Sequence, residues 1–269
     1  MNNHIMQKFN VRVIGDGELT LVLGHGFGSD QTAWRYQADA LAAQYRLVLF
    51  DYLGCGKADI RAYDPYYYSS IKSYRNDVIE IYEALELTKT VFIGHSVSAM
   101  IGSLVAIAEP DWISKLIFVG ASPRYLNDEN YIGGFEQADL DTLYETMAAN
   151  YLGWSSGFGP VAIANAGHPE LGKEFAGTLA AMRPDIAQSA ARLIFELDLR
   201  DQLGLIEQPV LILQAQRDIV VPQAVGEYLA SRIAHSQLIL LNAEGHLPHL
   251  SAPDEVLVSI QNFIVDTTN

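Results

Sequence analysis

Cysteine is almost absent from this chain: Cys55 is the only one among 269 residues. An internal disulfide is therefore excluded, and the composition is compatible with a reducing compartment. The sequence places no obvious histidine base beside Cys55, so a catalytic thiol is also disfavoured.

Positive charge is scarce as well. Only 17 lysine and arginine residues stand against 32 aspartate and glutamate residues, which gives a formal net charge of −15. A surface of that sign repels phosphate backbones and anionic lipids, so we expect neither a nucleic-acid partner nor a membrane-surface partner. An acidic balance is ordinary in soluble cytosolic proteins and indicates no particular partner.

No uninterrupted apolar segment of membrane-spanning length is present. The nearest candidate, 90–108, carries no formal charge, but Gly94, His95 and Ser96 interrupt it. A short strand, a turn and a helix fit this segment better than one spanning helix. The first fifteen residues, MNNHIMQKFNVRVIG, contain no apolar core of signal-peptide length, so we expect a soluble, cytoplasmic protein.

What the chain does contain is apolar residues, which make up 49% of it and gather in short runs. Runs that do not alternate with polar residues are typical of strands covered on both faces, as in a parallel sheet. Segments with apolar residues three and four apart, such as 73–87 and 253–266, are typical of helices. Alternating strands and helices predict an α/β fold with a doubly wound, mostly parallel sheet. The predicted strands are 19–26, 45–51, 90–95, 115–122, 209–216 and 236–243.

One interval breaks this alternation. Between Ser122 and Pro209 the pattern indicates only helices, at 139–154, 169–182 and 184–199, separated by breaks such as SSGFGP. A crossover between parallel strands needs only one helix. We therefore predict an inserted helical cap at about 123–200, within a single domain of residues 1–269, and expect it to cover what the strand ends present.

Ser96 stands at the end of the run 90–95, directly before small residues at helical spacing. A serine on such a sharp strand-to-helix turn exposes its hydroxyl above the sheet and can act as a nucleophile. The local sequence is Gly94-His95-Ser96-Val97-Ser98, so Ser98 replaces the second glycine of the usual G-x-S-x-G pattern. By itself, this pattern also fits a polar turn without a catalytic role.

A serine nucleophile needs a base, and the base needs a carboxylate that orients it. Asp218 follows the predicted strand 209–216, and His246 follows the predicted strand 236–243. The three residues thus come in the order serine, acid, histidine, and each lies where a strand ends. We predict that Ser96, Asp218 and His246 form a catalytic triad.

Other residues compete for these roles. His249 and His246 form an H-x-x-H pair, but no third zinc ligand is apparent and no clear helix carries the pair, so we expect no metal. His95 adjoins the nucleophile in a tight turn, so we expect its ring to point elsewhere, as a packed or hydrogen-bonded neighbour. Asp51 precedes the serine in sequence and is interpreted as the residue that holds its own turn together.

Acyl transfer also needs donors for the developing oxyanion. We expect one to be the backbone N–H of Val97, at the start of the helix after Ser96. The second is predicted to be the N–H of Phe27, in the glycine-rich segment GHGFGSD after the first strand. This segment is neither G-x-G-x-x-G nor a P-loop and has no lysine, so we expect no nucleotide and no other cofactor.

With these residues in place, the chain resembles the α/β-hydrolase superfamily over essentially its whole length. More narrowly, it is similar to the bacterial stress-response regulator RsbQ and to the plant karrikin and strigolactone receptors. Ser98 departs from those relatives, which usually keep glycine there. The matching segments are GHGFGSDQTAW, FDYLGCGKAD, GHSVSAMIG, GASPRYLND, GGFEQADLDTL, NYLGW, MRPDIA and EGHLPHLSAPDE.

The resemblance implies an α/β-hydrolase fold in which a four-helix, V-shaped cap covers a small apolar pocket. It implies a cofactor-independent serine hydrolase that acts on a small apolar ester or lactone-like ligand. The alternative is a ligand sensor with slow or single-turnover hydrolysis that signals to a protein partner, such as a stress-pathway phosphatase. Haloperoxidase-like activity uses the same triad and stays open, whereas dehalogenase or epoxide-hydrolase chemistry needs an aspartate at position 96. The expected pocket residues are Phe27, Val97, Trp154, Phe158 and Phe195.

Overall fold

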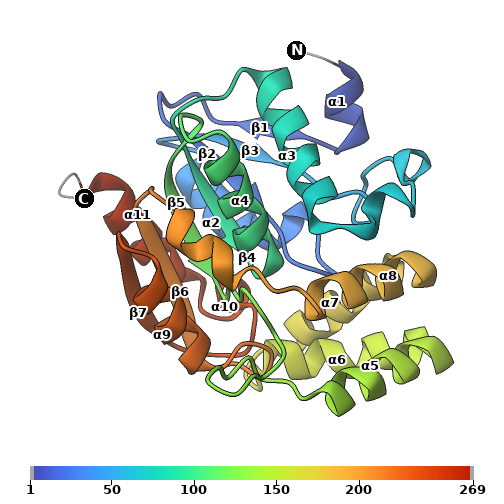
Figure 1. Cartoon of the computed structure of the whole chain (residues 1–269). Coiled ribbons are helices and arrows are strands. Elements are labelled where there is room, and N and C mark those ends of the chain that lie inside the picture. The colour runs from blue at the N-terminus through green and yellow to red at the C-terminus, as the bar shows by residue number, and fades with distance from the viewer. Residues whose placement is uncertain (1–2, 267–269) are drawn as a thin grey trace.

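The computed structural model describes residues 3–266, and within them seven strands form one sheet (Figure 1). The strand order is β1-β3-β2-β4-β5-β6-β7. All neighbouring pairs are parallel except β1 and β3, which pair antiparallel. The bounds are β1 (Arg12–Ile14), β2 (Thr20–Gly24), β3 (Arg46–Leu49), β4 (Thr90–His95), β5 (Ile113–Val119), β6 (Val210–Arg217) and β7 (Ser236–Glu244).

The six predicted strands correspond to β2 through β7, and the mostly parallel α/β fold is confirmed. Sequence reasoning missed β1. This strand has only three residues, lies at the sheet edge and is half-exposed, so it lacks the continuous apolar run that marks the central strands.

Alternate strand residues divide the core into two layers. On one face, Leu21 and Leu23 of β2 belong to a cluster with Trp34, Ile260 and Phe263, and α2 (Arg35–Leu41) and α11 (Pro253–Val265) cover it. The opposite face, which includes Val22 and Phe92, packs against α3, α4 and α9. Because successive strand side chains point to opposite faces, strands covered on both sides must be apolar throughout. The bounds are α3 (Ile71–Leu85), α4 (Val97–Ala108) and α9 (Gln223–Arg232).

Four helices lie between β5 and β6 in the chain and gather at one end of the sheet, at the lower right of Figure 1. We call these four helices the cap. They are α5 (Gln137–Ala149), α6 (Tyr151–Ile163), α7 (Pro169–Ala181) and α8 (Pro184–Phe195). Two short helices, α1 (Asn3–Lys8) and α10 (Pro248–Ser251), complete the α-helices of the described residues.

The predicted single helix at 139–154 is wrong. The chain leaves helical geometry at Asn150, with φ −155° and ψ 85°, and the Asn150 side chain accepts a hydrogen bond from the Gly153 N–H to begin α6. The segment SSGFGP, expected to be a break, lies inside α6. Its Gly159 packs so closely on Gly172 of α7 that a Cβ at Gly159 would lie 2.6 Å from the Gly172 carbonyl oxygen. Glycine here serves close helix packing, which sequence alone does not distinguish from a turn.

In the described part of the chain, no helix is both long enough and apolar enough to span a bilayer.

Candidate active site

Ser96 occupies the turn between β4 and α4, as the interpretation of 90–108 as strand, turn and helix requires. Its backbone has φ 55° and ψ −126°, a conformation that residues with a Cβ rarely adopt. The Ser96 N–H donates to the Val119 carbonyl of β5 at 2.8 Å, which holds the turn against the sheet. Strained residues of this kind cost about 1–3 kcal/mol and gather at functional sites.

Ser98, which stands where the usual pattern has glycine, is accommodated by two residues: one forms a hydrogen bond with it and the other leaves room for its side chain. Its Oγ lies 2.7 Å from the Tyr52 hydroxyl, in a buried hydrogen bond. The facing residue is Gly24 at the end of β2, where a Cβ would lie 2.0 Å from Ser98 Oγ. A serine at position 98 is therefore compatible with the turn at Ser96, because the opposing strand carries no side chain there.

The structure brings Ser96, His246 and Asp218 into one hydrogen-bonded chain. Ser96 Oγ lies 2.9 Å from His246 Nε2, and His246 Nδ1 lies 2.8 Å from Asp218 Oδ2. The other carboxylate oxygen, Oδ1, accepts the backbone N–H groups of Val220 and Val221 at 2.8 and 3.0 Å. An ionised carboxylate only accepts hydrogen bonds, so His246 carries its proton on Nδ1 and offers Nε2 to the serine hydroxyl.

The backbone of His246 is also held on both sides. Its N–H donates to the carbonyl of Ala162, near the end of α6 in the cap, at 2.7 Å. Its carbonyl lies 2.8 Å from His95 Nε2. A carbonyl only accepts, so His95 must donate from Nε2, and burial lowers the pKa of His95 well below its usual value and keeps this ring neutral. His95 is thus a hydrogen-bonded neighbour of the site, and it reaches the base rather than the nucleophile.

Tyr125 is a contact that sequence reasoning missed. Its hydroxyl lies 3.2 Å from Ser96 Oγ, and the side chain is buried. Burial raises the pKa of Tyr125, so its hydroxyl stays neutral and can donate to the serine oxygen. The residue lies in GASPRYLND, one of the segments that carry the family resemblance, but no catalytic pattern marks it. The other signal is its place in a loop after β5, which the strand order brings beside Ser96.

The two expected oxyanion donors lie close to Ser96. Val97 is the first residue of α4, so its N–H belongs to the unpaired first turn of that helix. Phe27 follows Gly26, whose backbone is near enough to Ser96 that a Cβ there would lie 3.2 Å from the Ser96 Cβ. Within residues 3–266, neither the Phe27 N–H nor the Val97 N–H has a hydrogen-bond partner.

His25, which the sequence did not single out, supports the Phe27 loop. The Tyr52 N–H donates to His25 Nε2 at 3.1 Å, so His25 Nδ1 carries the proton and donates to the Gly26 carbonyl at 2.9 Å. Burial lowers the pKa of His25, which keeps it neutral in this bridge. Asp51, interpreted as a turn anchor, accepts the backbone N–H groups of Gln31 and Lys57 at 2.9 Å each.

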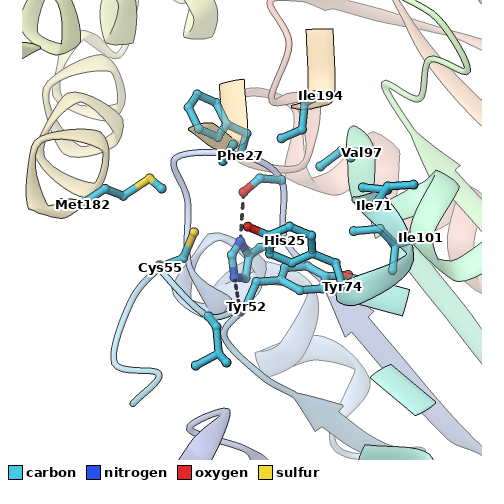
Figure 2. Close-up of a pocket in the computed structure, with 13 residues that line it drawn as sticks. His25, Phe27, Tyr52, Cys55, Ile71, Tyr74, Val97, Ile101, Met182 and Ile194 are labelled. Atoms are coloured by element: carbon cyan, nitrogen blue, oxygen red, sulfur yellow. Dashed lines mark hydrogen bonds between the residues drawn. The ribbon is translucent and has the colours of Figure 1, made fainter. Parts of the chain in front are cut away.

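An apolar cavity is lined by Phe27 and Val97, the expected oxyanion donors, together with residues of α3, α4 and α8 (Figure 2). It contains about 390 Å³ of empty space. In Figure 2, Val97, Ile71 and Ile101 lie along one side. Cys55 also lines it, and burial raises the pKa of this thiol to about 12, which keeps it protonated and a poor nucleophile.

Of the five expected pocket residues, Phe27 and Val97 line this cavity and the other three do not. Trp154 stacks on Phe158 with ring centroids 5.2 Å apart, because the two residues lie one turn apart on α6. Phe195 packs edge-on against Tyr125, with ring centroids 5.1 Å apart. The presence of aromatic residues in the cap sequence therefore did not identify which residues line the cavity.

His249 has no part in the hydrogen-bonded chain. Its ring lies between Trp34 and His95, with centroids 4.5 Å from each, and neither ring nitrogen has a partner within the described residues. Burial lowers its pKa to about 3, so the ring is neutral. No group of three or more histidine, cysteine, aspartate or glutamate side chains in residues 3–266 is arranged to hold a metal ion.

Comparison with known proteins agrees with this geometry. Residues 20–253 match the model of the alpha/beta hydrolase fold family. The chain is 44% identical to a karrikin insensitive 2 receptor of Petunia hybrida and 43% identical to a strigolactone esterase of Pisum sativum, with 94% of this chain and 94–95% of those proteins covered. A solved hydrolase from Oleispira antarctica is 36% identical, with a TM-score of 0.95 over 98% of this chain and 97% of that one. The chain belongs to the alpha/beta hydrolase fold family.

Proposed function

We propose that this protein is a cofactor-independent serine hydrolase that acts on a small apolar ester or lactone-like ligand beneath the cap. The observation that carries the proposal is the continuous hydrogen-bond chain from Ser96 Oγ through His246 to Asp218. Its three members come from the ends of three strands. The nucleophile, Ser96, has a strained backbone and lies beside two unpaired backbone N–H groups.

In the proposed reaction, Ser96 Oγ attacks the ester carbonyl while His246 Nε2 takes the hydroxyl proton. Asp218 stabilises the resulting imidazolium, and the N–H groups of Phe27 and Val97 hold the oxyanion. His246 then gives its proton to the leaving alkoxide oxygen, and an acyl-Ser96 intermediate remains. Water, deprotonated by His246, attacks the acyl carbonyl and the bond between Ser96 Oγ and the acyl carbon breaks. His246 returns the proton to Ser96 Oγ, and the carboxylic acid product leaves.

Tyr125 is proposed to orient the nucleophile. The serine hydroxyl donates its one proton to His246, so the neutral Tyr125 hydroxyl can donate to a lone pair of the same oxygen. This fixes the Ser96 rotamer with its proton toward the base.

The proposal is tested by labelling with a fluorophosphonate. We expect a single adduct on the intact protein that maps to the peptide containing Ser96, and loss of p-nitrophenyl acetate hydrolysis in Ser96→Ala. Ser98→Ala is the matched control, because this neighbouring serine bonds to Tyr52 and not to His246. An adduct on another serine, together with retained hydrolysis by Ser96→Ala, would contradict the proposal.

The second candidate function is a ligand sensor that hydrolyses its ligand slowly or once and signals to a regulatory protein partner. The observation that favours it is the similarity to relatives named as receptors, beside others named as esterases. A stress-pathway phosphatase as partner, and a cytoplasmic location, stay predictions. Product release over time separates the two functions: an enzyme turns over many equivalents per Ser96, whereas a single-turnover sensor stops near one.

A further inference from the structure

A second hollow lies on the outside of the protein, between the start of α3 and the cap helix α8. It contains about 890 Å³ of empty space, against about 390 Å³ in the inner cavity. Polar side chains, among them Ser70, Ser189 and Arg192, contribute to its wall. We call it the outer groove.

Among the described residues, Ile71 alone lines both the inner cavity and the outer groove. It is the first residue of α3 and follows Ser70, which has extended backbone geometry and caps the helix. The side chain is nearly buried, at 6% exposure. Ile71 therefore lies between a smaller apolar space and a larger, partly polar one.

The inner cavity has a defined position relative to the chemistry. A leaving alcohol must lie beside His246, because His246 Nε2 delivers the proton to its oxygen. No residue of the loop that carries His246 lines the cavity, whereas Phe27 and Val97, the proposed oxyanion donors, do. The cavity thus opens on the carbonyl side of the scissile bond and away from the leaving group.

We propose that the inner cavity is the acyl-chain subsite and that Ile71 sets the length of acyl chain that it accepts. The inference rests on the proposed hydrolase function and narrows its substrate class, from esters and lactones in general to open-chain esters of short, apolar acyl groups. The cavity's small volume and apolar wall favour short chains of methylene groups over bulky or polar acyl groups. A longer chain is stopped at Ile71, beyond which the outer groove has room for it.

The test is a series of p-nitrophenyl esters with unbranched acyl chains of increasing length, measured as kcat/KM. Ile71→Ala joins the two spaces, so we expect the optimum to move to chains longer by about two carbons. Each newly buried methylene is worth about fourfold, so kcat/KM for esters just beyond the wild-type optimum should rise about tenfold relative to those at it. Ile71→Val should shift the profile in the same direction by less.

The matched control is Ile81→Ala, which trims a buried isoleucine of the same helix that lines neither space. We expect it to leave the acyl-length profile unchanged. A second series of acetate esters with alcohols of increasing length keeps the acyl group constant, and Ile71→Ala should not change that profile. Circular dichroism establishes that each variant is folded, and Ile71→Val carries the test if Ile71→Ala does not fold.

Three results would overturn the inference. The first is an unchanged acyl profile in folded, active Ile71 variants. The second is a change in the alcohol series alone, which would make the cavity the leaving-group subsite. The third is absence of ester hydrolysis and of Ser96 labelling in the wild-type protein, which would remove the proposed function as well. The first two leave the hydrolase function standing, so the failures are distinguishable.

Discussion

The loop after β7 and the short helix α10 that follows it each carry a buried histidine, only three residues apart, and the two differ completely in their partners. His246 bonds through both ring nitrogens, to Ser96 and to Asp218. His249 is fully buried, yet its two ring nitrogens have no partner within residues 3–266. The two rings thus share burial and a contact with His95. What distinguishes the catalytic base is that one ring nitrogen faces the serine hydroxyl, which donates to it, and the other faces a carboxylate.

The largest effect that we expect is on the acylation rate, when each histidine is substituted in turn. In His246→Ala the serine proton has no acceptor, so we expect the acylation rate to fall on the order of 10³-fold or more, as in other triads. In His249→Phe the ring contacts with Trp34 and His95 can be kept, so the rate should change less than tenfold. Stopped-flow release of p-nitrophenol measures acylation, with circular dichroism as the folding control. A dead His249→Phe beside an active His246→Ala would reverse the assignment.

This part of the site was predictable because its signals are local. Ser96, Asp218 and His246 each follow an apolar run, and parallel strands bring such ends to one edge of a sheet. The histidine pair was separable only because His246 comes first after its strand. His95, by contrast, was expected to point away from the chemistry, and its bond to the His246 carbonyl depends on the relative position of β4 and β7, which no local pattern encodes.

The cap shows where prediction from sequence ended. The helical pattern alone indicated three cap helices, whereas the structure has the four that the family resemblance implied. Glycines that pack α6 on α7 look the same in sequence as glycines in a turn. The cavity wall was only partly predicted for a related reason. Trp154 and Phe158 are aromatic, but which helix face they occupy depends on how α6 meets its neighbours. Ile71, from α3 outside the cap, lines the cavity and carries no motif.

A smaller effect is expected at His95, which contacts His246 without taking part in the triad. His95→Leu removes the donor to the His246 carbonyl, and a displacement of the base by about 1 Å can cost up to about 100-fold in rate. We expect kcat to fall about 10–100-fold with KM nearly unchanged, because substrate binding does not use this bond. His95→Gln keeps an N–H donor near the position of Nε2 and should recover most of the loss. Equal defects in both variants, or a change confined to KM, would show that His95 only fills space.

The smallest effect that we expect is on the free energy of unfolding, and it comes from the unpartnered ring of His249. Burial lowers the pKa of His249 from 6.5 in the unfolded chain to about 3 in the folded protein. Between these values the unfolded chain binds a proton that the folded chain does not. The contribution of neutral His249 to the free energy of unfolding is therefore at its full value above pH 6.5. It falls as the pH falls below 6.5, by about 1.4 kcal/mol per pH unit at most.

His249→Phe removes this proton uptake and leaves the other buried histidines, His25, His95 and His246, in place. The difference in unfolding free energy between wild type and variant therefore isolates His249. We expect the difference to be constant above pH 7 and to change in favour of the variant as the pH falls from 6.5 to 4.5. Urea unfolding followed by circular dichroism at half-unit pH steps measures it. If the unfolding free energies of wild type and variant ran parallel across that window, the folded protein would bind a proton at His249 as readily as the unfolded chain does. His249 would then differ from His246 in the position of its ring and not in its ability to carry charge.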